Sequence, residues 1–235
     1  MRVQDCNWMQ LEEYLRADDR IVLPLGSVEQ HAYLSLAVDV ILSERVSVEA
    51  AEPLGVPVLP SLPFGITPYF AAYPGSPTLT ADTYRRVVTE LLESLYGQGF
   101  RRFLLVNGHG GNDPGGEAAA DWSAGHDDAQ TIWHNWWNAP RTWEVVRAID
   151  PDASHASWLE NFPWTRLAGV EQPQARKPRA DISRMRDSDP VQVREQLGDG
   201  SLGGLYERPD EDVLRVWQAG VDEVRDLLED GWSRG

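Results

Sequence analysis

The sequence predicts an α/β protein whose mostly parallel sheet is covered by helices on both faces. Two short apolar runs, IVLPLG at 21–26 and RRFLLV at 101–106, are typical of buried strands. Segments with the periodicity of helices lie between and after these runs. Strands that alternate with helices form parallel sheets with helices on both sides. The length of 235 residues fits one domain over 1–235.

The first part of the chain is predicted to contain two helices and two strands before a long loop. Apolar side chains spaced as on one helical face predict a helix over 8–15, which the strand at 21–26 follows. A second helix is expected over 40–51, where a proline ends it, and VPVLP at 56–60 is predicted as the next strand. Residues 61–79 then form a connection rich in proline and glycine, and loops of this length are often functional.

The second part is predicted to begin with a helix capped by Thr80 or Asp82 and ended by Gly97 and Gly99. Residues 163–208 are rich in proline, arginine and aspartate, and no element is assigned to them. The other expected elements are, in chain order, a strand over 101–106, a helix over 113–124, a strand over 129–136, a helix over 141–149 and a final helix over 210–232.

The composition argues against several classes of partner. The formal net charge is −16, whereas proteins that bind a phosphate backbone need clustered lysine and arginine, and an anionic membrane surface is disfavoured for the same reason. Cys6 is the single cysteine, so an intrachain disulfide is impossible. The sequence has no signal-peptide pattern and no apolar run of bilayer length. We therefore expect a cytoplasmic protein that acts on a small molecule.

Polar residues follow both apolar runs at the point where the predicted strands end. Glu29 and His31 come after 21–26, and His109 lies among glycines after 101–106. Since ligands of parallel α/β sheets bind outside the carboxyl ends of the strands, these side chains are expected to face one pocket, within reach of Asp39. A set of two imidazoles and two carboxylates suits zinc, manganese or iron.

Each of these residues also has an ordinary structural explanation. His31 taken alone fits a loop histidine, Asp39 fits a helix cap, and Glu29 fits a solvated acid. The chain has five histidines, however, and two of them directly follow apolar runs. Because of that coincidence, a metal site and a pair of polar loops are equally favoured explanations.

A further cluster is SHASWLENF at 154–162, which contains His155 and Glu160. The two residues are five apart, so a regular helix does not present them on one face, and an irregular segment is needed to bring both to one pocket. The alternative is an exposed loop. Aromatic residues crowd around this cluster, and flat side chains stack on small rings. We expect the substrate pocket to be shaped by four of the chain's aromatic residues, namely Tyr73, Trp136, Trp137 and Trp158.

Taken in order, these motifs resemble those of the creatininase family. The matching blocks lie between about 20 and 162 and are LPLGSVEQH at 23–31, Asp39, YPGSPTL at 73–79, NGHGGN at 107–112, and His155 with Glu160. The resemblance implies a three-layer α/β/α fold, two divalent metal ions of the zinc or manganese type, hydrolysis of small C–N bonds, and a homo-oligomer, often a hexamer.

The resemblance also implies a role for individual residues. Asp39 matches the ligand that bridges the two ions, and His155 matches the histidine that donates and accepts protons. Glu160 matches the acid of a late motif, which serves as a ligand. The residues that match metal ligands are Glu29, His31, Asp39, His109 and Glu160.

Three departures from the family pattern question creatinine as the substrate. HAYLSLAVD at 31–39 lacks the second histidine and the proline that commonly follow the first histidine. Phe70 stands where many members have histidine, and Gly111 stands where creatininase itself has an acid.

We hypothesise hydrolysis by a metal-bound hydroxide, because a divalent cation lowers the pKa of bound water to about 7 and polarises a carbonyl. His155 would protonate the leaving group as its general acid, and Glu160 would act beside it. The substrate is expected to be a small, cyclic amide. The alternatives are ring opening of a cyclic polyol ketone such as an inosose, deformylation, peptide trimming, or a ligand-binding protein that keeps the fold without catalysis.

Overall fold

The computed structural model describes residues 1–181, 183 and 188–232 of the chain. Within these residues the sheet has three parallel strands in the order β1, β2, β3. The strands are β1 (Arg20–Leu25), β2 (Arg102–Asn107) and β3 (Gln130–Asn135). The α-helices are α1 (Trp8–Tyr14), α2 (Val38–Ala51), α3 (Ala81–Gln98), α4 (Asp113–Ala124), α5 (Pro140–Ile149), α7 (Pro190–Leu197) and α8 (Asp210–Asp230).

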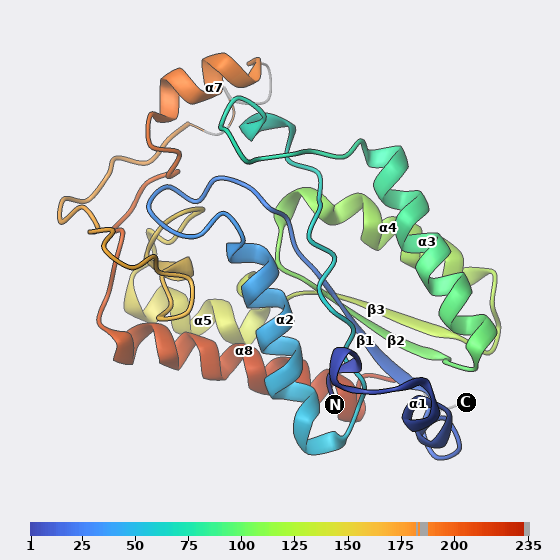
Figure 1. Ribbon diagram of the computed structural model, residues 1–235. Helices are drawn as coiled ribbons and strands as arrows, with labels where there is room; N and C mark the ends of the chain where they lie inside the picture. Colours follow the sequence, from blue (N-terminus) through green and yellow to red (C-terminus); the bar gives the residue numbers. More distant parts are fainter. Residues whose placement is uncertain (182, 184–187, 233–235) are drawn as a thin grey trace.

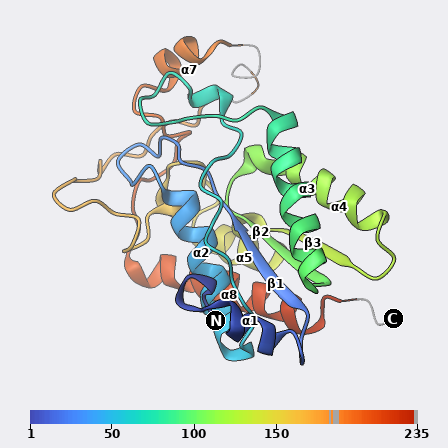
Figure 2. The same cartoon turned by 45° about the vertical axis from the view of Figure 1, so that its right-hand side comes forward.

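Helices cover the sheet on both faces, so the expected three-layer α/β/α arrangement is confirmed. Figure 1 shows α3 and α4 on one side of the strands and α2, α5 and α8 on the other, and Figure 2 keeps this separation in a second view. Alternate residues of each strand point to opposite faces. Accordingly Phe103 and Leu105 of β2 pack in the core beneath α3 and α4, whereas Leu104 and Val106 pack in the core beneath α2 and α8.

The ends of the helices follow the chemistry of their terminal residues. The Thr80 side chain accepts a hydrogen bond from the backbone N–H of Thr83, which resolves the choice of cap for α3. Gly99 ends this helix with φ of +114°, a conformation that favours glycine. Helix α4 has the predicted bounds, and α8 ends at Asp230, two residues before the predicted end.

The strand predicted over 56–60 is wrong as a regular strand. Val58 makes isolated bridges to Val22 and to Arg2, next to β1, but 56–60 does not continue as a ladder among the described residues. The carbonyl of Pro24 accepts a hydrogen bond from the N–H of Leu62 at this edge of β1. In a strand the N–H and C=O of one residue face the same side, so the N–H that proline lacks would have faced this edge too. Prolines on both sides of the pairing therefore interrupt the ladder.

A smaller apolar cluster lies above the carboxyl ends of the strands. Helix α7, in the stretch to which the sequence assigned no element, packs on the 3₁₀ turn Pro68–Phe70, and Figure 1 shows the two side by side. Its residues Val193 and Leu197 contact Phe70 and Tyr73. Part of the unassigned stretch lies outside the described residues. No helix of the described chain is both long enough and apolar enough to cross a bilayer.

Candidate metal centre

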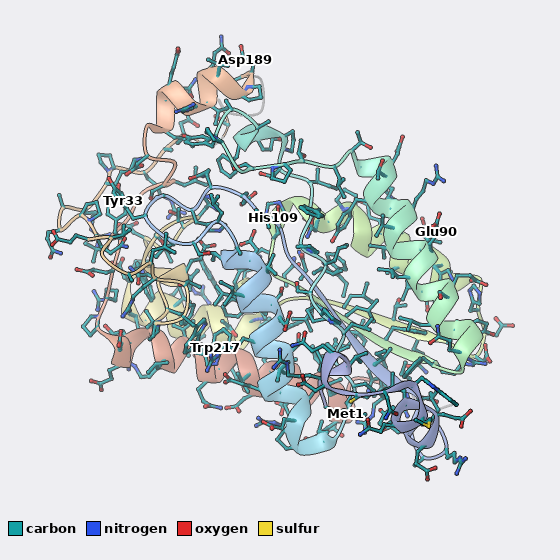
Figure 3. All side chains as sticks on the ribbon, in the orientation of Figure 1. Met1, Tyr33, Glu90, His109, Asp189 and Trp217 are labelled. Atoms are coloured by element: carbon teal, nitrogen blue, oxygen red, sulfur yellow. The ribbon has the colours of Figure 1, made fainter. Side chains whose placement is uncertain are left out.

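Four elements bring the five predicted ligands to one edge of the sheet. Glu29 and His31 lie on the segment that leaves β1, and His109 lies two residues beyond the end of β2. Asp39 is in the first turn of α2, and Glu160 ends the 3₁₀ turn Trp158–Glu160. Figure 3 labels His109 between the sheet and the loops that lead to α7. The expectation that the two strand ends face one pocket is confirmed.

Asp39 lies between the two histidines and offers one oxygen to each. His31 Nε2 is 3.1 Å from Asp39 Oδ1, and His109 Nδ1 is 3.1 Å from Asp39 Oδ2. His109 Nδ1 is also 3.3 Å from Glu29 Oε1, and His31 Nε2 is 3.7 Å from Glu160 Oε2. Three groups of three ligand atoms result. Asp39 belongs to two of them, and the third joins Glu29, His31 and His155.

Backbone carbonyls determine which nitrogen of each ring faces the carboxylates. His109 Nε2 is 2.9 Å from the carbonyl oxygen of Ile66, and His31 Nδ1 is 3.1 Å from that of Glu29. A carbonyl only accepts, so each of these nitrogens carries a proton. A neutral ring then aims its lone pair at carboxylates, which is unfavourable unless a cation lies between them. Metal-binding histidines characteristically donate their other N–H in this way.

Unpaired buried atoms at the same place support this conclusion. Glu29 Oε2, His31 Nε2 and Asp39 Oδ2 make no hydrogen bond of good geometry with any described residue. Buried polar atoms without a partner are costly. Imidazole and carboxylate donors so arranged suit zinc and manganese, so the residues present fit a pair of divalent cations.

Without a metal, the charge of the cluster is balanced by protons. Burial favours the neutral ring of His31, but the carboxylates of Asp39 and Glu160 outweigh it and raise the pKa of His31 to about 10. The pKa of His109 is likewise raised against burial, by Glu29 and Asp39. Burial raises the pKa of Glu160 to about 7, against the pull of His31. Two imidazolium groups thus occupy the position of cations among buried carboxylates.

His155 lies beside this cluster and differs from the other two histidines. Its Nδ1 is 3.5 Å from Glu29 Oε1, and its ring stacks on Phe70 with centroids 4.7 Å apart and planes 19° apart. Burial and the neighbouring His31 lower the pKa of His155 to about 4. The ring is therefore neutral near pH 7 and carries a single proton.

An irregular segment presents His155 and Glu160 together, as their spacing required. Ala156 between them adopts φ of +54°, and its backbone N–H donates to Glu160 Oε2 at 2.6 Å. This turn points the carboxylate toward His31. The alternative of an exposed loop is wrong, because His155 and Glu160 are largely buried.

A cavity of about 300 Å³ opens onto the cluster, and its walls correct the predicted aromatic set. Trp137 lines the cavity as expected, and Trp143 and Phe70 line it as well. Trp143 could have been singled out, because it lies in the same tryptophan-rich stretch. The other apolar lining residues of the described chain are Ile66, Tyr69, Ala153, Leu159 and Leu202.

Three of the predicted aromatic residues lie away from the described cavity wall. Trp158 is 0% exposed and Trp136 is 2% exposed, both within the core on the α8 side. Trp136 packs edge-on against Trp217 with centroids 5.5 Å apart. Tyr73 packs beneath α7, and its hydroxyl donates to the carbonyl of Gly198. Large aromatic rings are most stabilising where they are fully buried, and these sites bury them.

Substituting Trp158 by alanine should therefore destabilise the fold rather than change substrate binding. We expect a loss of about 3–5 kcal/mol in the free energy of unfolding, the usual cost of removing a large buried ring. Trp137→Ala, at the half-buried cavity wall, should cost clearly less and weaken substrate binding. Urea unfolding of both variants checks this. Equal stability of the two variants would contradict the assignment of Trp158 to the core.

Gly111 stands where the family resemblance implies an acid, and the structure leaves no room for a side chain there. A Cβ at this position would lie 1.9 Å from the carbonyl oxygen of Ile66 and 2.5 Å from His109 Nε2. The Ile66 carbonyl thus occupies the space that a side chain would need, and it holds the His109 ring. Glu160 is left as the acid beside His31.

A sequence model of the creatininase family, described as creatinine amidohydrolase, matches residues 4–232. The chain belongs to the creatininase family. A creatinine amidohydrolase of Pseudomonas putida is 27% identical over 163 residues, which are 64% of this chain and 63% of that protein. A 3-dehydro-scyllo-inosose hydrolase of Thermotoga maritima is 28% identical over 109 residues, 46% of this chain and 35% of that protein. The matches span less than two thirds of either relative.

Solved creatininase structures share the fold over nearly the whole chain. A crystal structure of creatinine amidohydrolase (creatininase) has a TM-score of 0.79 at 23% identity and covers 100% of this chain and 98% of its own. Two other creatininase structures, both 22% identical, are described as a Zn–Zn mutant form and a manganese form, with TM-scores of 0.79 and 0.78. Each covers 99% of this chain, and 98% and 99% of its own respectively. These likenesses establish the creatininase fold of the chain.

Proposed function

We propose that the chain is a metal-dependent hydrolase that cleaves the amide C–N bond of a small, uncharged and largely apolar substrate. Two divalent ions, zinc or manganese, would be held by Glu29, Asp39 and His109 on one side and by His31, Asp39 and Glu160 on the other. The observation that carries this proposal is the position of Asp39, whose two oxygens belong to two separate ligand groups. The zinc and manganese forms of creatininase agree with the choice of metals.

The ions supply the chemistry that the protein lacks, since divalent cations lower the pKa of water and polarise a carbonyl. The protein contributes position and proton transfer. Oxygen from water adds to the amide carbon and the C–N bond breaks. The leaving nitrogen takes a proton from His155, which lines the cavity next to Glu29, and His155 takes up in return the proton that the water has lost. Trp137 and Phe70 line the cavity and would limit the access of bulk water to the cluster.

The composition of the cavity wall favours an amide over a polyol. All charged or titratable side chains among the described lining residues belong to the cluster itself, apart from the phenol of Tyr69. A cyclic amide or formamide needs few hydrogen bonds away from its reacting carbonyl. A polyol ketone such as an inosose carries many hydroxyls, and beyond Thr67 and Ser154 the walls offer them few polar partners. Each hydroxyl left unpaired costs about 1–3 kcal/mol. The inosose hydrolase among the relatives keeps ring opening of such a ketone as the second candidate.

A substrate screen with zinc or manganese added distinguishes these candidates. We expect turnover of cyclic amides or formamides that carry apolar groups, and little turnover of inosose-like ketones. Turnover of the ketones alone would assign C–C bond cleavage instead. A protein that binds metal but hydrolyses nothing in the screen would fit the ligand-binding alternative. The homo-oligomer that the family resemblance implies, often a hexamer, is checked by light scattering in solution.

Removing the metal should lower the stability of the protein. We expect about two ions per chain by elemental analysis, and a chelator should lower the unfolding temperature because the buried carboxylates lose their cations. Returning zinc at about 100 times its dissociation constant should restore about 2.7 kcal/mol. Magnesium, which prefers oxygen ligands and keeps its waters, serves as the control and should restore less. A protein with no ions and no response to zinc would contradict the metal centre.

A further inference from the structure

Gln30 has a buried side chain to which the proposed mechanism gives no role, and it stands between two of the proposed metal ligands in the sequence. It is 4% exposed and lies between Glu29 and His31 in the chain. Its backbone N–H donates to Ser76 Oγ at 2.9 Å, which ties this segment to the long loop. The amide itself reaches across to His155, 125 positions away in the sequence.

Two backbone groups determine which end of the Gln30 amide faces which way. The backbone N–H of Ala32 points at Oε1 at 3.1 Å, so this atom must be the acceptor. The carbonyl of Gly200 lies 3.0 Å from Nε2, so this atom must be the donor. The amide has two N–H bonds, and the second is free to donate to His155 Nε2 at 2.8 Å.

We propose that Gln30 is a positioning residue that holds His155 as the tautomer with its proton on Nδ1. When the Gln30 amide donates to Nε2, that nitrogen must present its lone pair, and the single proton of the neutral ring then resides on Nδ1. The opposite tautomer would donate a hydrogen bond from Nε2 to the backbone carbonyl oxygen of Gln30, 3.0 Å away. In that tautomer the N–H of His155 Nε2 and the amide N–H of Gln30 would face each other at 2.8 Å. The lone pair of His155 Nδ1 would then point at Glu29.

The contacts around the ring support this arrangement. Nδ1 lies 3.5 Å from Glu29 Oε1, so a proton on this nitrogen faces a carboxylate oxygen. Phe70 stacks on the ring, and His31 packs against it with centroids 4.4 Å apart. Phe70 and His31 restrict the ring plane, so the Gln30 amide decides only the place of the proton.

The position of Gly200 is a second sign that the space is reserved for the Gln30 amide. Gly200 has φ of +99°, and a Cβ there would lie 1.7 Å from Gln30 Oε1. A side chain at 200 would therefore displace the amide from His155. The segment that follows α7 thus closes over Gln30 with glycine at the contact.

The consequence concerns the direction of proton transfer, and this step rests on the proposed function. His155 keeps its proton on the nitrogen that faces the cluster of carboxylates, where the C–N bond is proposed to break. It is therefore ready to donate to a leaving nitrogen without a change of tautomer. Hydrogen-bond partners that fix the tautomer of a metal-binding histidine contribute about 10- to 100-fold to activity, and we expect an effect of this size for Gln30.

Nitrogen NMR of isotope-labelled histidine tests the tautomer without any substrate. In zinc-treated protein at neutral pH, we expect the His155 signal, assigned by its loss in His155→Gln, to show a protonated Nδ1 and an unprotonated Nε2. Gln30→Met keeps the size but removes the donor, and should move the proton to Nε2. Gln30→Glu offers only an acceptor and should do the same. An Nε2-protonated or doubly protonated ring in the unsubstituted protein would overturn the proposal, as would an unchanged tautomer in Gln30→Met.

Controls separate this effect from misfolding and from failure of the hydrolase proposal. His126 and His134 lie outside the cluster, so unchanged signals from them report an intact fold, and Gln98→Met is a matched substitution at an exposed position. If Gln30→Met does not fold, Gly200→Ala, which displaces the amide through its Cβ, should produce the same change of tautomer, and its failure to do so overturns the proposal. Because the tautomer is read directly, absence of hydrolysis would refute the proposed function but leave this result intact. Once a substrate is known, kcat of Gln30→Met should fall about 10- to 100-fold with little change in KM.

Discussion

Replacing Asp39 by asparagine should remove both metal ions from the chain and abolish hydrolysis. Each oxygen of Asp39 lies 3.1 Å from a different imidazole nitrogen, so the carboxylate contributes to both ligand groups. An amide has one oxygen and no charge and cannot replace it. We expect turnover to fall at least about 1000-fold, because several kcal/mol of charge stabilisation are lost and each 1.4 kcal/mol is tenfold.

Elemental analysis and activity of Asp39→Asn should be measured beside Asp82→Asn. Asp82 also lies in the first turn of a helix but is exposed on α3, so its substitution should leave metal content and turnover unchanged. If Asp39→Asn retained two ions, Asp39 would be a helix-end acid rather than a bridging ligand, and the proposed centre would be wrong.

Glu160→Gln should release one ion and leave the other in place. The group of His31 contains only Asp39 and Glu160 as carboxylates, and losing one of them leaves a weak site. The group of His109 keeps both Glu29 and Asp39. Turnover should fall steeply, since a water molecule would lose one of its two activating cations. The glutamine can still accept from the N–H of Ala156, so the turn that contains it should persist.

The decisive comparison is the metal content of Glu160→Gln and of His109→Ala. His109→Ala should weaken the other ion site, and Glu171→Gln is the control at an exposed acid. If Glu160→Gln kept both ions and full activity while His109→Ala lost metal, Glu160 would not be a ligand. A purely structural acid should tolerate the change within about 0.5 kcal/mol.

Local sequence signals predicted most of the secondary structure, and their failures have local causes. The strands β1 and β2 are short apolar runs that end where polar residues and glycine begin, and α4 has the bounds that its pattern predicted. The strand expected over 56–60 has the right position beside β1. It lacks a continuous ladder because Pro24 and the prolines of the segment itself cannot donate.

The aromatic residues of the pocket could not be predicted in the same way. Trp136 and Trp137 are neighbours in the sequence, yet Trp136 is buried against Trp217 while Trp137 lines the cavity. Composition cannot tell these environments apart, because a tryptophan is equally suited to a core and to a ring-binding wall. The way the turn after β3 docks on α8 decides which ring points inward.

The sequence by itself determined the α/β class and the candidate ligands, because both depend on local patterns. An apolar run followed by polar residues places those residues at a strand end, and parallel strands bring their ends to one edge of a sheet. Only the tertiary structure decided how these groups are used. It placed Asp39 between His31 and His109, turned Glu160 toward His31 through the left-handed turn at Ala156, and set Gln30 against His155. The contacts that select a tautomer or share a carboxylate join segments far apart in the chain, so side-chain packing and not local pattern creates them.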